Sequence, residues 1–197
     1  MSNREGRLMR TTSTNFYATR DEATEKLSIE GYFAVFNSNY EIAPDMSESI
    51  APGAFDNTIA DDVRALINHD TTLVLGRTKA GTLQLRTDNH GLWGHIDINP
   101  NDTDAMNLYN RVQRGDVDQC SIGFDILNEE TDFREDGSVH WTIKEVKLYE
   151  VSACTFPAYE ETNIAARTKE KEDLVRRKND AWKESVLKKL KGESENA

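Results

Sequence analysis

The stretch TLVLGRTKAGTLQLRTDNHGLWGHIDINP, from Thr72 to Pro100, decides the fold class. Apolar and polar residues alternate through most of it, which is the period of a β-strand with one buried face. Turn sequences at 79–81 and 89–91, each containing glycine, separate three such runs. The stretch therefore predicts a β-meander of three antiparallel strands.

Further strands are predicted on both sides of the meander, and only one helix lies between them. The helix is DTDAMNLYNRVQRGDV, which Asp102 or Thr103 caps and Gly115 ends. A loop rich in breakers, 41–59, leads into a short helical piece near Asp56–Ala60. The strands are LSIEGYFAVFN (27–37), DVRALINHD (62–70), QCSIGFDIL (119–127) and, after a polar hairpin at 134–138, HWTIKEVKLYEVSACTF (140–156). The chain is therefore expected to be mainly β with a few helices (α+β), with an antiparallel sheet, open or closed into a barrel, as the leading architecture.

Composition narrows the function classes. The 197 residues carry a formal charge of −11, and the pI is near 4.9. Such a chain is repelled by phosphate backbones, so neither nucleic-acid nor anionic-membrane binding is expected. No apolar run approaches the roughly 20 residues of a membrane helix, and the N-terminus has no apolar segment of a secretory signal. Cys120 and Cys154 are expected to be free thiols in a cytosolic protein.

The chain divides into three segments by composition. Residues 1–24 are predicted to be a flexible polar arm, with one edge strand around Phe16 and Tyr17. Residues 25–166 form the folded domain. Residues 167–197 form a highly charged helical tail, in which Val175, Trp182, Val186 and Leu190 share one face. The tail is either a solvated helix or a helix that binds a partner or drives oligomerisation.

The strand DVDQCSIGFDI, Asp116–Ile126, places a small hydroxyl at its centre. Ser121 is either a structural serine whose hydroxyl is hydrogen-bonded within the sheet, or a nucleophile. Cys120 is the rival nucleophile, but it shares the parity of Ile122 and Phe124 and so faces the core, where a thiol tends to be inert. The alternation favours Ser121, which shares the other face with Gly123.

A serine nucleophile needs a base, and four histidines are available. His90, His95 and His140 are predicted to be structural or solvated, because each lies in a turn or opposes apolar neighbours. His69 ends the apolar parity of its strand at the rim of the core, where an imidazole with a pKa near neutrality is useful. Without a partner, a buried structural histidine remains the alternative interpretation.

Glu150 lies in a strand that looks apolar on both faces. A carboxylate there is costly unless it is paired, and an imidazole N–H is a suitable partner. Glu150 would then fix the His69 tautomer and stabilise the imidazolium. The chain has neither paired-cysteine nor HExxH metal motifs, and no glycine-rich phosphate loop, so no metal and no cofactor are expected.

Four pieces of the chain, in order, resemble the prohead (capsid-maturation) serine proteases of tailed bacteriophages, distant relatives of the herpesvirus assemblins. They are IAPGAF (50–55), ALINHD (65–70), RVQRGDVDQCSIGF (111–124) and LYEVSACTFPAY (148–159). The resemblance implies an assemblin-like antiparallel β-barrel surrounded by helices, plus the charged C-terminal helix. It also implies Ser121 as nucleophile and His69 as general base, with Glu150 where assemblins carry a histidine. The oxyanion donors would be backbone N–H groups near Gly123 or in the loop 158–159.

The same resemblance implies a function: a serine endopeptidase that cleaves scaffold or capsid-protein segments, and itself, during capsid assembly. Scaffold and major capsid proteins would be its substrates and partners, inside the procapsid in the host cytoplasm. Assemblins act as dimers, which makes a homodimer a candidate state. Two alternatives remain: a catalytically inactive scaffold or assembly protein of the same fold, and a stand-alone esterase.

Overall fold

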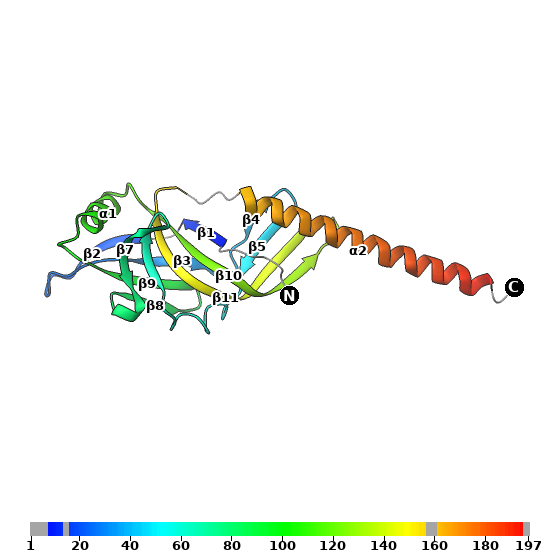
Figure 1. The fold of residues 1–197 in the computed structure, drawn as a ribbon, viewed down its shortest axis with the longest axis horizontal. Helices are drawn as coiled ribbons and strands as arrows, with labels where there is room; N and C mark the ends of the chain where they lie inside the picture. Colours follow the sequence, from blue (N-terminus) through cyan, green and yellow to red (C-terminus); the bar gives the residue numbers. More distant parts are fainter. Residues whose placement is uncertain (1–7, 14–15, 157–160, 195–197) are drawn as a thin grey trace. The chain divides into compact units, whose positions relative to one another are not determined.

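A computed structural model describes residues 8–13, 16–156 and 161–194 of the chain (Figure 1). The chain divides into two compact units, residues 1–159 and residues 160–197. The first unit contains the strands of two β-sheets and one α-helix, and the second contains one long α-helix. The mainly β, α+β class predicted from the alternating pattern is confirmed, and so is the C-terminal helix.

The larger sheet has seven strands and is built around one long hairpin. β10 (Gln119–Phe133) and β11 (Val139–Cys154) pair antiparallel on either side of the predicted turn. β1 (Leu8–Ser13) pairs with the other edge of β10. The remaining strands follow β11 on its other side: β4 (Tyr40–Ala43), β5 (Met46–Ile50), β6 (Arg64–Ile67) and β7 (Asp70–Arg77). Figure 1 shows the two long strands side by side, coloured green and yellow.

The smaller sheet has four antiparallel strands. Their order is β2 (Phe16–Arg20), β3 (Leu27–Val35), β9 (Gly91–Ile98) and β8 (Leu83–Thr87). The predicted edge strand around Phe16 and Tyr17 is β2, and β8 and β9 form the second hairpin of the predicted meander. The prediction of a first hairpin between β7 and β8 is wrong, because β7 pairs with β6 instead. A 3-10 helix, η1 (Thr78–Ala80), ended by a left-handed Gly81, carries the chain from the larger sheet to the smaller one.

The predicted antiparallel barrel is wrong: the two sheets do not close on each other. The reason is that the segment 46–67 forms hydrogen bonds along the edge of β11 that does not pair with β10. β5 pairs with Val139–Ile143 and β6 with Glu150–Ala153, both in parallel. Between them, Val146 N bonds Ala54 O at 3.1 Å and Leu148 N bonds Thr58 Oγ1 at 2.9 Å. The larger sheet is therefore mixed, and this edge of β11 has no room for a strand of the smaller sheet.

The segment 41–59 also differs from its prediction. It contains β4 and β5, because Pro44 and Asp45 form the turn between the two strands instead of breaking them; Asp45 has a positive φ of 61°. The prediction of a short helix near Asp56–Ala60 is wrong. One helical bond, from Ile59 N to Phe55 O, is not continued, and the segment consists of consecutive turns.

One hydrophobic core joins the two sheets. It contains Ile29, Phe33 and Ile96 from the smaller sheet together with Ile122 and others from the larger one. The predicted internal helix, α1 (Thr103–Arg114), is confirmed and packs on β2, β3 and β9. Asp102 is its cap, accepting the N–H groups of Asp104 and Ala105, and Gly115 ends it with a φ of 81°.

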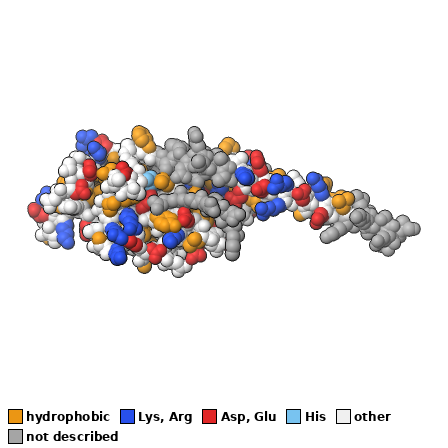
Figure 2. Space-filling model, viewed as in Figure 1, with side chains coloured by type: hydrophobic (Ala, Val, Ile, Leu, Met, Phe, Trp, Pro, Cys, Tyr) orange, Lys and Arg blue, Asp and Glu red, His pale blue; other side chains and the backbone are white. Residues whose placement is uncertain are grey.

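The second unit contains α2 (Glu161–Ser194), the C-terminal helix, which begins six residues before the predicted start of the tail at residue 167. Figure 2 shows Lys, Arg, Asp and Glu side chains interspersed along its visible face. Trp182 is 66% exposed on α2, so its large apolar surface faces solvent. Of the helices in the described ranges, neither is long and apolar enough to cross a membrane.

Candidate active site

His69 lies in the two-residue turn between β6 and β7. The strand ends at Ile67, so His69 does not continue the strand parity as the sequence predicted. Asn68 and His69 have positive φ angles of 49° and 62°, as in a type I′ hairpin turn. Asn tolerates this conformation better than most residues. In this turn the His69 side chain does not join the core face of β6, and it is 13% exposed.

Glu150 lies on β11, directly after a β-bulge. The register pairs Gly123 with Glu150 but Phe124 with Leu148, so Tyr149 is the extra residue. Simple alternation predicted that Leu148 and Glu150 share one face of the strand. Because of the bulge, Leu148 instead lies in the core together with Val151. Glu150 is on the opposite face and only 1% exposed. After the bulge, Val151 and Ala153 point into the core, whereas Glu150 and Ser152 form a buried polar face on the other side of β11.

The structure brings His69 and Glu150 together across 81 residues of sequence. His69 Nδ1 lies 2.6 Å from Glu150 Oε1. An ionised carboxylate only accepts hydrogen bonds, so the ring donates from Nδ1, and in a neutral ring the lone pair is then on Nε2. This is the tautomer in which a histidine can accept a proton at Nε2.

Ser121 lies on β10, on the same buried polar face. Its partner in the ladder is Ser152 of β11, and directly opposed residues of antiparallel strands point to one face. Ser121 is fully buried, and its Oγ has no hydrogen-bond partner in the described part of the chain. The structure therefore places Ser121 on the face of Glu150 but does not bond its hydroxyl to His69.

The two cysteines lie on opposite faces. Cys120 is in the core, as predicted, and its Sγ contacts Tyr32 O at 2.9 Å. Cys154 Sγ lies 3.7 Å from His69 Nε2, a neighbour that the sequence did not reveal. Burial, followed by the charge of Glu150, raises the pKa of the Cys154 thiol to about 12. At neutral pH Cys154 is therefore a protonated thiol beside His69 Nε2, and not a thiolate nucleophile.

Ser152 is the residue of this site that sequence reasoning missed. Its Oγ donates to Glu150 Oε2 at 2.6 Å and accepts from His69 N at 3.2 Å. Its position two residues after Glu150 on a strand was a usable signal, because alternate strand residues share a face. The bond to the backbone of His69 could not be anticipated, because it depends on the turn.

The other three histidines lie elsewhere. His140 is half-buried between Ser47 Oγ at 2.8 Å and Ser49 Oγ at 2.9 Å, and burial lowers its pKa. His95 lies near two carboxylates of the smaller sheet, and His90 is exposed in a turn. None of the three contacts Ser121 or Glu150 within the described residues. Their geometry fits the structural or solvated interpretation.

The predicted oxyanion donors are backbone N–H groups near Gly123 and in the loop 158–159. The loop 158–159 lies outside the described residues. Gly123 is inside β10, with β1 on one side and β11 on the other, so its N–H faces a neighbouring strand.

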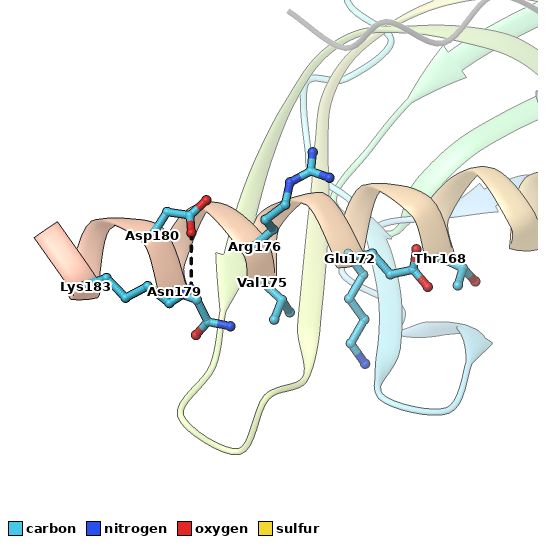
Figure 3. Close-up of a pocket in the computed structure, with 8 residues that line it drawn as sticks. Thr168, Glu172, Val175, Arg176, Asn179, Asp180 and Lys183 are labelled. Atoms are coloured by element: carbon cyan, nitrogen blue, oxygen red, sulfur yellow. Dashed lines mark ion pairs between the residues drawn. The ribbon is translucent and has the colours of Figure 1, made fainter.

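A shallow hollow of about 530 Å³ follows α2 (Figure 3). The described residues that line it all belong to that helix: Thr168, Lys171, Glu172, Val175, Arg176, Asn179, Asp180 and Lys183. Asp180 and Lys183 form an ion pair of 3.7 Å there, marked by the dashed line in Figure 3. The hollow contains none of the predicted catalytic residues. Across the described ranges, no group of three or more His, Cys, Asp or Glu is placed to hold a metal ion.

The chain is similar to several known proteins. The prohead protease of Enterobacteria phage HK97 is 33% identical over 141 residues, which cover 70% of this chain and 58% of that protein. This chain therefore matches less than two thirds of that relative's length. The solved structure of the bacteriophage T4 capsid assembly protease, gp21, has a TM-score of 0.48 and 10% identity, covering 76% of this chain and 97% of that one. The family model described as Caudovirus prohead serine protease matches residues 14–177, which is most of the sequence, and the chain therefore belongs to that family.

Proposed function

We propose that this chain is a serine endopeptidase of phage capsid maturation, with Ser121 as nucleophile, His69 as general base and Glu150 as the group that orients the base. The observation that carries the proposal is the 2.6 Å bond between His69 Nδ1 and Glu150 Oε1. A buried carboxylate on Nδ1 prepares Nε2 to accept a proton, and a serine lies on the same face of the sheet.

The chemistry runs in two halves. Ser121 Oγ attacks the peptide carbonyl carbon while its proton moves to His69 Nε2, and Glu150 stabilises the resulting imidazolium. The imidazolium gives its proton to the leaving amine, and an ester on Ser121 remains. A water molecule then attacks the ester carbonyl carbon while one of its protons moves to Nε2. Nε2 returns that proton to Ser121 Oγ as the bond between the acyl carbon and Oγ breaks, which releases the new carboxyl group and restores the hydroxyl.

Two features of the resting structure bear on this reaction. His69 Nε2 faces the Cys154 thiol, so the ring must exchange that contact for the Ser121 hydroxyl. Catalytic hydrogen bonds are often long or absent before substrate binds. Ser121 is also fully buried, so a substrate carbonyl reaches it only after a local opening around β10. The active form therefore differs locally from the resting form.

The substrates and partners of the proposed enzyme are scaffold and major capsid proteins, and the chain itself. It would act inside the procapsid, in the host cytoplasm, as a monomer or a homodimer. Family membership supports this assignment, because a prohead protease acts on the proteins of the procapsid. No cofactor is required by the mechanism, since every proton transfer uses side chains of the chain.

A fluorophosphonate probe tests the assignment of the nucleophile. Attack by an activated serine expels fluoride and leaves a stable phosphonyl adduct on Oγ. We expect one adduct per chain, found by mass spectrometry on the tryptic peptide 115–134, in which Ser121 is the only serine. Protein denatured before labelling is the control and should carry no adduct.

Two outcomes would contradict the assignment. An adduct on the tryptic peptide 148–167 would make Ser152 the nucleophile. Native protein that never reacts, together with procapsids that assemble but are not cleaved, would favour the inactive assembly protein.

We further propose that the tail, residues 167–197, is a segment that binds scaffold and is removed by self-cleavage. It carries ten basic and seven acidic side chains, whereas the whole chain has a net charge of −11. A net-basic helix with exposed Trp182 and Leu187 suits an acidic partner with an apolar stripe.

Deletion of residues 167–197 tests the tail. We expect fewer copies of the protease in each procapsid, by about 10-fold, because a loss of about 1.4 kcal/mol in binding lowers occupancy tenfold when binding is weak. Quantitative mass spectrometry of purified procapsids measures the copies. An unchanged copy number in procapsids would reject the targeting role, and fluorophosphonate labelling of the truncated chain checks that the site is intact.

A further inference from the structure

The turn that carries His69 needs support from outside itself. Two successive residues that are not glycine have left-handed φ angles, a conformation that costs on the order of 1–2 kcal/mol for each ordinary residue. Asn68 provides part of the support: its N–H bonds Ala153 O, and its Oδ1 accepts Thr155 N, both at 2.9 Å. These bonds hold Asn68 against the end of β11 but do not touch His69.

Ser152 provides the support for His69 itself. A hydroxyl has one proton to donate and lone pairs that accept, and here both functions are used. Ser152 Oγ accepts the backbone N–H of His69 at 3.2 Å and donates its proton to Glu150 Oε2 at 2.6 Å. The direction of the second bond is unambiguous for an ionised carboxylate, which has no proton to give.

The contacts close a cycle through three residues. Glu150 uses Oε2 for Ser152 and Oε1 for His69 Nδ1. Ser152 returns the cycle to the backbone N–H of His69. Both the main chain and the ring of His69 are therefore held relative to one carboxylate. The cycle is almost dry, because Glu150 is 1% exposed and Ser152 fully buried, so water does not compete for these bonds.

We propose that Ser152 is a positioning residue of the active site. It orients the Glu150 carboxylate toward Nδ1 and fixes the His69 turn, so that Nδ1 is held by Glu150 and Nε2 is left for proton transfer. The inference rests on the proposed function for its catalytic meaning, but the hydrogen-bond cycle can be measured without catalysis. Ser152 is not a second nucleophile, because its proton is committed to Glu150 and the described neighbour of Nε2 is Cys154.

The test uses Ser152→Ala and a matched pair, Ser152→Thr and Ser152→Val, in the full chain. Thr and Val have nearly the same shape, and only Thr keeps the hydroxyl. We expect Ser152→Ala and Ser152→Val to lower the maximal rate of fluorophosphonate labelling at Ser121 by about 10- to 100-fold. The probe concentration for half-maximal rate should change less than about 3-fold, because Ser152 does not touch the probe. Ser152→Thr should recover at least about 10-fold over Ser152→Val.

A double-mutant cycle separates positioning from general stability. In Glu150→Gln protein the carboxylate is already lost, and Ser152 keeps only its bond to the backbone N–H of His69. Adding Ser152→Ala should therefore lower the labelling rate by a smaller factor than it does in the wild type. Multiplicative losses of the two substitutions would overturn the proposal. So would a Ser152→Ala variant that labels at the wild-type rate, or a Thr and Val pair that behave alike.

Histidine-labelled NMR provides a readout that needs no activity. In the wild type the His69 Nδ1–H bonded to Glu150 should give a downfield proton resonance, assigned by its loss in His69→Gln. Ser152→Ala should broaden or shift that resonance, and Ser152→Thr should restore it. If Ser121 proves not to be the nucleophile but the resonance responds as expected, the proposed function fails while the positioning cycle stands. An unchanged resonance in Ser152→Ala would overturn the cycle itself.

Discussion

Ser121→Ala is expected to lower the rate of peptide-bond cleavage by about 10⁵-fold or more, because no other group on the buried polar face can form the acyl-enzyme. Cys154 is protonated, with its pKa raised to about 12, and the Ser152 hydroxyl is bonded to Glu150. The measurement is intact mass of the purified wild type beside Ser121→Ala, after each is expressed alone and with the capsid proteins. The wild type should show cleaved products, and the variant only full-length chains.

The same substitution should leave the fold unchanged. Ser121 Oγ is buried and has no hydrogen-bond partner in the described structure, so its removal orphans no other group. We expect the melting temperature of Ser121→Ala to equal or slightly exceed that of the wild type. Ser138→Ala, in the turn between β10 and β11, is the matched control and should keep full activity. Cleaved products from Ser121→Ala would remove the serine mechanism altogether.

His69→Gln is expected to lower the cleavage rate by about 10⁴-fold, because a glutamine amide cannot accept and return the Ser121 proton. Glutamine is preferred to alanine here, since its N–H can still donate to Glu150. Alanine would leave Oε1 of that buried carboxylate unpaired, at a cost of about 1–3 kcal/mol in stability. The rate of fluorophosphonate labelling at Ser121, measured beside thermal unfolding, separates the two effects.

His140→Gln is the matched control for His69→Gln. His140 is also half-buried, also carried by the larger sheet, and bonded to two hydroxyls, but it contacts neither Ser121 nor Glu150. Its replacement should leave the labelling rate within about 3-fold of the wild type. If His140→Gln lost activity while His69→Gln kept it, the general base would be His140, between Ser47 and Ser49, instead of His69.

Local patterns in the sequence were sufficient for several of the individual elements, although not for the segment 41–59. The cap and the C-terminal glycine of α1 lie within a turn of the helix that they delimit, and both were readable without a structure. The alternation in β10 likewise separated Cys120, in the core, from Ser121 on the other face. Such features depend on neighbours a few residues away, so a sequence determines them directly.

The pairing of strand edges that joins the elements into two sheets could not be predicted from the sequence. A barrel and two unclosed sheets require the same alternating strands, and they differ only in which edges pair. The segment 46–67 bonds along the edge of β11 from Val139 to Ala153. That choice compares pairings between residues far apart in the chain, and alternation within one strand contains no information about it.

The chemistry of the site divides in the same way. The sequence by itself determined which side chains could serve, namely a strand serine, a histidine at a strand end and a costly carboxylate in a buried strand. Only the tertiary structure decided that a bulge at Tyr149 turns Glu150 away from the core, that a left-handed turn presents His69 to it, and that Ser152 joins the two. The physical reason is that a hydrogen bond of 2.6 Å between residues 69 and 150 depends on the register and backbone angles of three strands at once, and these are settled only when the sheet is assembled.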